Sequence, residues 1–329
     1  PFRRNQFGGA IGGPVYIPKV YNGKDRTFFF FHYEASRQSS QATVLDTVPT
    51  ELQKMGDFSN TRDASGNLIR IFDPNSLNAA GLRSPFPNNV IPQSRIDPVA
   101  RYSMQFYPTA NLPGNNFTNI NNFFNSGARV ANDYQTTMKV DHNFTELQRV
   151  SVRYSQYRNT SNSPNLWGNW MSPYDDGYVS PGDVTRNASA DYTYTINPTT
   201  ILNLRWGVAR QFGVRKPFCE QCPEFNINDF GFNGPMNTQI PPNFQPEGFA
   251  ALGTRPWARV NRGEDVNHFV GNVTKIAGNH TIKFGGDLRI YRLNYAQPGW
   301  NSVSFNFNRQ TTSENPFAGN ALQGNGLAS

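Results

Sequence analysis

Apolar and polar side chains alternate with a period of two residues along much of the chain. Between residues 134 and 141, for example, Tyr134, Met138 and Val140 alternate with polar or charged neighbours. Because successive side chains of a β-strand point to opposite faces, this period predicts strands with one apolar and one polar face. We expect about eight or nine antiparallel strands, with bounds near 5–16, 27–40, 133–142, 148–159, 184–196, 200–212, 264–276, 280–294 and 301–310.

The connections between these strands alternate between short and long. Turns of a few residues are expected at 143–146, 197–199 and 277–279, whereas long polar segments fill 160–183 and 213–263. All short turns would then lie at one end of the strands and all long loops at the other. Outer-membrane β-barrels have this asymmetry, with apolar residues facing lipid and polar residues facing the lumen. A soluble antiparallel β protein whose apolar face packs inside gives the same alternation, and periodicity alone does not separate the two.

A long polar insertion separates the second expected strand from the third, over residues 41–133. Residues 48–52 predict a short capped helix, and residues 97–106 predict another, which begins with an Asp-Pro cap. A loop of this length is usually functional rather than a simple connection. We therefore expect one all-β domain over residues 1–329. It would be a partial, antiparallel transmembrane β-barrel with short periplasmic turns and long extracellular loops that contain short helices.

The composition narrows the possible functions without identifying one. Charged residues make up 16% of the chain and aromatic residues 14%, so the chain is too aromatic and too weakly charged to be disordered. It contains no run of about 18 apolar residues that would form a transmembrane helix, and its two cysteines are too few for a disulfide scaffold. The net charge of +7 comes mainly from arginines spread singly along the chain, so we expect no nucleic-acid partner. Motifs for metal binding or catalysis are also lacking, and we expect no enzyme, metal or cofactor.

An ordered set of short motifs runs along the chain. The motifs are residues 2–9 (FRRNQFGG), 12–14 (GGP), 26–34 (RTFFFFHYE), 47–50 (TVPT), 55–59 (MGDFS), 72–74 (FDP), 85–89 (PFPNN), 91–92 (IP), 95–98 (RIDP), 319–322 (GNAL) and 326–329 (GLAS). In this order they resemble TonB-dependent outer-membrane transporters of the Oar-like group, and the resemblance spans essentially the whole chain. Residues 2–14 are similar to the entry of that family's barrel, just after its plug.

The resemblance implies uptake of a scarce ligand across the Gram-negative outer membrane. In such transporters, extracellular loops and the plug capture the ligand, and energy delivered through the TonB complex loosens the plug. The ligand would be an oligosaccharide, a peptide or a metal chelate, and outer-membrane lipid would cover the apolar strand face. The alternative is a secreted or surface β-sandwich that acts as an adhesin or binds glycans, without transport.

Several parts of such a transporter are not recognisable in this sequence. We find no plug, no TonB-contact segment and no C-terminal closing strand. The sequence starts at Pro1 without a signal segment and stops at Ser329 without a terminal signal. We therefore expect an internal fragment of a longer chain, with the TonB complex acting through the plug region.

Aromatic side chains in the long loops are the candidate ligand contacts. Exposed rings can stack on sugars or peptides. Packing between loops, or an aromatic girdle at the membrane interface, would use such rings equally well. The candidate ligand-binding residues are Trp167, Trp170, Tyr174, Tyr178 and Trp257.

Three other motifs have a chemical interpretation and a structural one. Cys219 and Cys222 form a Cys-Glu-Gln-Cys motif in a long loop, for which we expect a local disulfide, with a metal or redox role as the alternative. The glycine-rich residues 8–13 are superficially similar to a phosphate-binding loop, but no helix follows them, so we expect a strand bend or close packing against a plug. Residues 63–67 (DASGN) lack the later Glu of a calcium loop and predict a hairpin turn.

Overall fold

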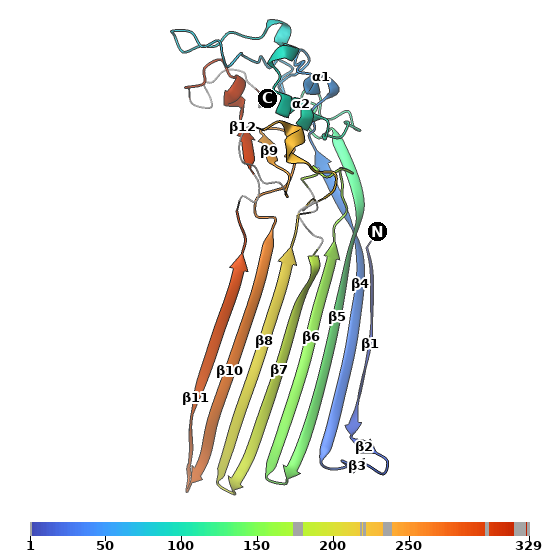
Figure 1. Cartoon of the computed structure of the whole chain (residues 1–329), viewed down its shortest axis with the longest axis vertical. Coiled ribbons are helices and arrows are strands. Elements are labelled where there is room, and N and C mark those ends of the chain that lie inside the picture. The colour runs from blue at the N-terminus through green and yellow to red at the C-terminus, as the bar shows by residue number, and fades with distance from the viewer. Residues whose placement is uncertain are drawn as a thin grey trace.

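The chain is built around one large antiparallel sheet (Figure 1). The computed structural model describes residues 2–173, 180–217, 219, 222–232, 239–299, 303–318 and 327. The sheet has eight strands in the order β1-β4-β5-β6-β7-β8-β10-β11. The strands are β1 (Arg3–Pro14), β4 (Thr27–Asp46), β5 (Phe123–Thr145), β6 (Gln148–Asn162), β7 (Ser180–Asn197), β8 (Thr200–Arg215), β10 (Val260–Ala277) and β11 (His280–Ala296). The predicted fold class is confirmed; within the described residues β1 and β11 are the two edges, and the sheet does not close.

Eight of the nine expected strands occur in this sheet, whereas the ninth, expected near 301–310, forms a shorter strand outside it. The short strand found there, β12 (Ser304–Phe307), instead pairs in parallel with β9 (Asn243–Pro246) in the loop region. Its alternation comes from Phe305 and Phe307, whose rings pack against loop residues and not on a face of the large sheet. An alternating pattern of four residues does not distinguish these two environments.

The strands β4 and β5 extend farther toward the loops than the sequence predicts. Their backbone pairing continues to Asp46 and Phe123, through positions rich in Ser, Gln and Asn. Such positions do not alternate between apolar and polar, although their backbone groups still form the ladder. The insertion between these strands is therefore residues 47–122 and not 41–133.

Tight turns join β5 to β6, β7 to β8 and β10 to β11, and all three lie at the same end of the sheet (Figure 1). In the last of them Gly278 adopts a φ of 59°, in the left-handed region that favours glycine. The short ribbon of β2 (Tyr16–Ile17) and β3 (Tyr21–Asn22) lies at this end too. The turns predicted at 197–199 and 277–279 are confirmed, whereas the one predicted at 143–146 lies at 146–147, because β5 continues to Thr145. We call this the turn end and the opposite one the loop end.

The two faces of the sheet differ in polarity. On the face that we call the apolar face, Val152, Leu204 and Trp206 are 47%, 45% and 42% exposed. On the other face, which we call the polar face, Thr137 is only 8% exposed. A soluble sandwich would show the reverse, because its apolar side chains are buried between two sheets. Among the described residues no second large sheet covers the apolar face, so the sandwich alternative does not describe this fold.

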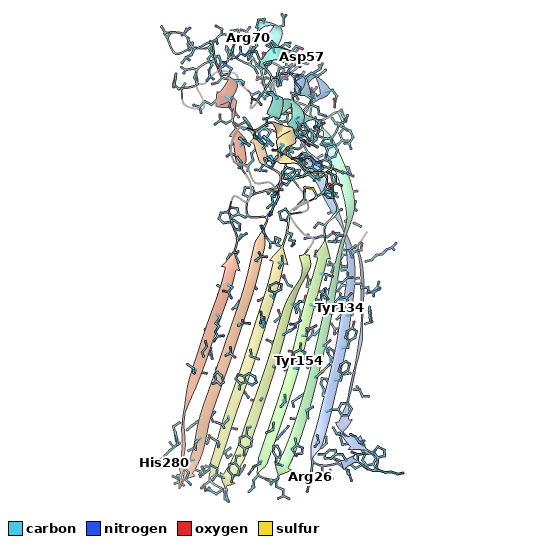
Figure 2. All side chains as sticks on the ribbon, viewed as in Figure 1. Arg26, Asp57, Arg70, Tyr134, Tyr154 and His280 are labelled. Atoms are coloured by element: carbon cyan, nitrogen blue, oxygen red, sulfur yellow. A yellow bond between two sulfur atoms is a disulfide. The ribbon has the colours of Figure 1, made fainter. Side chains whose placement is uncertain are left out.

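The main hydrophobic core lies beyond the loop end of the sheet, in a unit that we call the cap. The cap consists of the described residues in the connections after β4, β6 and β8 and after β11 (Figures 1 and 2). Its helical elements are α1 (Glu51–Lys54), η1 (Pro87–Asn89), η2 (Gln93–Arg95), α2 (Pro98–Met104), η3 (Ile227–Phe230) and η4 (Arg309–Thr312). In the part of the chain that the structure describes, no helix is long and apolar enough to cross a membrane.

Both predicted cap helices form, and their capping residues explain where they begin. The Thr50 hydroxyl accepts a hydrogen bond from the Gln53 amide at 3.3 Å, and the Gln53 side chain accepts one from the Thr50 amide at 2.9 Å. This capping box starts α1 at Glu51, three residues after the predicted start. The Asp97 carboxylate accepts a hydrogen bond from the Val99 amide at 2.8 Å, which starts α2 as the Asp-Pro cap predicts.

Candidate functional site

Charged side chains on the polar face form ion pairs within and between neighbouring strands. Strand pairing places Asp191 of β7 opposite Arg205 of β8, and the two side chains form an ion pair. Near the turn end, Asp141 lies within ion-pair distance of two cations. On β10 and β11, His268 Nε2 lies 2.7 Å from Asp287 Oδ2. The polar face thus carries many charged side chains, several of them in ion pairs, which suits a water-filled interior.

The glycine-rich segment 8–13 forms part of strand β1, and close packing explains two of its glycines. A Cβ on Gly8 would collide with the carbonyl oxygen of Tyr33, and one on Gly12 would lie 2.9 Å from the carbonyl oxygen of Phe29. The neighbouring Gly9 has no heavy atom within 4 Å of such a Cβ. These glycines therefore allow close packing against strand β4, and packing against a plug stays a prediction.

Two of the predicted ligand-contact residues lie inside the cap. Trp167 is 7% exposed, and its indole Nε1 donates a hydrogen bond to Asp46 Oδ2 at 3.3 Å. The Trp170 ring centroid lies 4.4 Å from that of Phe106 and 5.5 Å from that of Phe225. These two indoles fill the centre of the cap, so a ligand would reach them only if the cap opened.

The other three predicted ligand-contact residues differ in what the structure says of them. Trp257 is 55% exposed, and its backbone is held by hydrogen bonds to Gly299 and from the Gln297 side chain. Its ring is therefore available to solvent while its backbone is fixed. Tyr174 and Tyr178 lie outside the described residues. The role of all five aromatic residues in ligand contact stays a prediction.

A cavity of about 700 Å³ lies within the cap. Residues of α2, including Pro98 and Val99, line it together with phenylalanines near β9 and β12. The rings of Phe232, Phe244 and Phe305 are nearly parallel, with centroid distances of 5.4 Å between Phe232 and Phe305 and 5.2 Å between Phe244 and Phe305. A cavity with aromatic walls and a few polar groups is the usual form of a small-molecule site.

Sequence reasoning missed this cavity. The phenylalanines that line it come from three separate parts of the chain, after β4, after β8 and after β11, and their one local signal is the Phe-x-Phe spacing at 305–307. That spacing also occurs in any exposed strand, so it does not locate a cavity.

An ion pair lies at the edge of the cavity. Arg95, which lines the cavity, donates hydrogen bonds from both terminal nitrogens to the Asp73 carboxylate, at 2.7 and 2.9 Å. The hydrogen bond from Arg95 lowers the pKa of Asp73 below its ordinary value. The pair therefore keeps its charges at neutral pH and fixes the segment before α2 against the rest of the insertion 47–122.

A buried tyrosine joins two of the cap's loops. Tyr107 is 4% exposed, and its hydroxyl donates a hydrogen bond to the carbonyl oxygen of Ala250 at 2.7 Å. Burial raises the pKa of Tyr107 well above its ordinary value, and the charge of Asp46 adds to this effect. The hydroxyl therefore stays protonated and keeps donating across the physiological pH range.

Cys219 and Cys222 are joined by a disulfide in the connection between β8 and β10. Cys219 is 2% exposed and belongs to the main core of the cap. Residues 63–67 form the predicted hairpin turn, in which the Asp63 carboxylate accepts hydrogen bonds from the amides of Ser65 and Asn67. Among the described residues, no three His, Cys, Asp or Glu side chains are grouped so that they could hold a metal ion.

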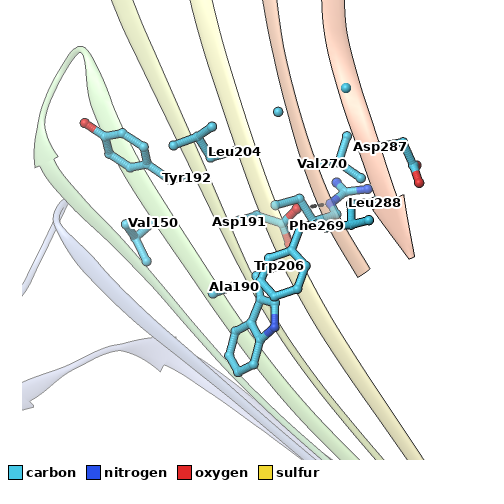
Figure 3. Close-up of a pocket in the computed structure, with 13 residues that line it drawn as sticks. Val150, Ala190, Asp191, Tyr192, Leu204, Trp206, Phe269, Val270, Asp287 and Leu288 are labelled. Carbon is cyan, nitrogen blue, oxygen red and sulfur yellow. Dashed lines mark hydrogen bonds and ion pairs between the residues drawn. The ribbon is translucent and has the colours of Figure 1, made fainter. Parts of the chain in front are cut away.

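A second hollow, of about 730 Å³, lies where the sheet lacks side chains at Gly271 and Gly286 (Figure 3). Its apolar lining comes from the apolar face and includes Leu204, Trp206 and Phe269. The hollow is open along the sheet and offers few polar groups to orient a ligand. It is therefore a feature of the apolar face and not a second polar site.

Comparison with known proteins agrees with the fold. Residues 1–329 match the model of a family described as outer membrane beta barrel domain. No curated protein matches the chain, and no solved structure does. The family match covers the sheet and the cap together.

Proposed function

Because the chain belongs to the outer membrane beta barrel domain family and lies in the bacterial outer membrane, we propose that it is part of a TonB-dependent transporter. It takes up a scarce ligand, and no step of its action is catalytic. The sheet supplies part of the barrel wall, the polar face lines the passage, and the cap captures the ligand. The TonB complex acts through a plug that lies against the polar face. The ordered motifs that resemble the Oar-like group support this proposal.

The observation that carries the proposal is the position of the cap cavity at the loop end of the sheet. A passive pore needs only a water-filled lumen, whereas a high-affinity transporter also needs a ligand-binding site on its extracellular side. The cap has its own hydrophobic core and encloses a cavity with aromatic walls, next to the loop end of the strands. Its ligand would be an oligosaccharide, a peptide or a metal chelate with an apolar or aromatic group that fits this cavity.

The test compares uptake with and without energy coupling in the bacterium that makes the protein. Strains that lack this protein, or TonB, are supplied with metal chelates, oligosaccharides or peptides as the limiting nutrient. We expect both strains to lose growth on the same nutrient. Normal growth on every nutrient without this protein, or uptake that continues without TonB, would contradict the proposal.

Two matched substitutions test whether the cavity takes part. Val99 lines the cavity, so Val99→Trp should fill it and reduce uptake by about tenfold or more, which corresponds to roughly 1.4 kcal/mol of lost binding. Leu77, also in the insertion 47–122, is 46% exposed and does not line the cavity, so Leu77→Trp should leave uptake unchanged. If the two variants are present in equal amounts in the outer membrane and support equal uptake, the ligand does not bind in this cavity.

A further inference from the structure

A row of charged side chains crosses the apolar face toward the loop end of the sheet. Arg186 of β7 pairs with Arg210 of β8, Arg210 pairs with Asp265 of β10, and Asp265 pairs with Arg292 of β11. We call these four residues the charged row. Because side chains alternate between the faces with a period of two residues, all four lie on the apolar face, which also carries Leu204 and Trp206.

The charged row lies where the apolar band of a membrane-spanning barrel would end. On β10, Lys275 next to the turn and Asp265 in the charged row point to the same face. About ten residues separate them, or roughly 34 Å at about 3.4 Å per residue. A strand tilt of about 40° reduces this to roughly 26 Å across the membrane, close to the apolar height of about 25 Å in such barrels. The charged row is therefore level with the lipid head groups on the loop side.

The row carries more positive than negative charge, although it contains one ion pair. Arg210 Nε lies 3.5 Å from Asp265 Oδ1, yet the Arg210 side chain remains 62% exposed. Arg186 donates a hydrogen bond to the neutral side chain of Gln156 at 3.2 Å. The row thus has three arginines and one aspartate, with two of the arginines directly opposite each other. Like charges at such positions repel, and a bound anion would remove this cost.

We propose that the charged row binds the phosphate groups of phosphorylated lipids in the loop-side leaflet. A guanidinium forms two parallel hydrogen bonds to one phosphate, which makes arginine the preferred residue for this contact. Long arginine side chains can rest their methylene groups on the apolar band and extend the charged group to the head-group layer. The proposal depends on the membrane location of the protein and not on the transport function.

The test measures binding of lipid A, a diphosphorylated glycolipid, to the full-length protein in neutral detergent micelles, by native mass spectrometry. Each arginine should contribute about fivefold to the affinity. We expect Arg210→Gln to weaken binding about fivefold, and the triple variant with Arg186→Gln and Arg292→Gln to abolish most of it. Asp265→Asn should strengthen binding, because it removes a competing carboxylate. Lipid A with one phosphate should bind less tightly, and inorganic phosphate at millimolar concentration should not displace the lipid.

The matched control is Arg153→Gln, which removes an arginine of the polar face about three residues nearer the turn end than the charged row. It should leave lipid A binding unchanged. The proposal is overturned if the triple variant binds as tightly as the unaltered protein, if Arg153→Gln weakens binding as much as Arg210→Gln, or if Asp265→Asn weakens it. If the triple variant does not fold, the opposite effects expected of Arg210→Gln and Asp265→Asn decide the question alone. Displacement by inorganic phosphate would also overturn it, as it would indicate a free-anion site.

Discussion

Substitutions at two adjacent residues of β8 test the assignment of the two sheet faces. Leu204 is on the apolar face and Asn203 on the polar face. Leu204 lies about four residues from the turn end of β8, or roughly 10 Å into the membrane at a rise of about 3.4 Å and a tilt of about 40°. That depth is near the middle of an apolar band about 25 Å thick, where an outward arginine costs about 2–4 kcal/mol. We expect this loss in Leu204→Arg and a loss under about 1 kcal/mol in Asn203→Arg.

A larger apolar side chain at the same site separates lipid from a packed core. Leu204 is 45% exposed, and its cross-strand neighbour Gly271 has no side chain. Leu204→Trp should therefore change the free energy of unfolding by less than about 1 kcal/mol, whereas overpacking in a closed core costs about 1–3 kcal/mol.

The assay for these variants is reversible urea unfolding of the full-length protein in lipid vesicles, followed by tryptophan fluorescence. If Leu204→Arg and Leu204→Trp are both strongly destabilising, the apolar face packs against protein. If Asn203→Arg is as damaging as Leu204→Arg, the assignment of the two faces is wrong.

The remaining predictions concern the cap and the edge strand. Cys219 and Cys222 should resist thiol labelling on intact cells until a reductant is added, and ready labelling of both would contradict an exported disulfide. Gly8→Ala should destabilise the sheet by about 1–2 kcal/mol in urea unfolding while Gly9→Ala does not, because only the first substitution meets the backbone of β4. Asp73 has a lowered pKa, so it stabilises the cap above its unfolded pKa of about 3.9 and loses that contribution as the pH falls through its lower folded value. Asp73→Asn should make acid unfolding of the cap between about pH 4 and 2 less steep, and an unchanged acid transition would contradict this.

The strands of the large sheet could be predicted because the alternation of apolar and polar residues is a local pattern. Each strand shows its own period of two, so residues such as Tyr192 and Leu204 can be assigned to a face without knowledge of any partner. Turn chemistry then fixes the order of neighbours, as at Gly278. In the loop-end halves of β4 and β5 the residues no longer alternate, and the predicted strands therefore end too early. There the pairing is maintained by backbone hydrogen bonds that leave no periodic signal.

The cap could not be predicted, because its core is assembled from distant segments. Trp167 and Trp257 occur in similar polar loops, yet the first is 7% exposed and the second 55%. The difference arises because Trp167 meets Tyr107, Phe123 and Asp46, which belong to other parts of the chain. The composition of such a loop therefore does not predict whether its tryptophan is buried or exposed.

The composite core of the cap also sets an order of events in folding. The three tight hairpins of the sheet close contacts between residues that are near in sequence, which is fast. The cap core takes Val44 from the end of β4, Trp167 from the β6–β7 connection, Phe225 from the β8–β10 connection and Phe305 from the segment after β11. Each of these segments supplies only a part of the main core. The main core of the cap can therefore assemble only after the last of these segments has reached the loop end, so that its formation marks the completion of insertion.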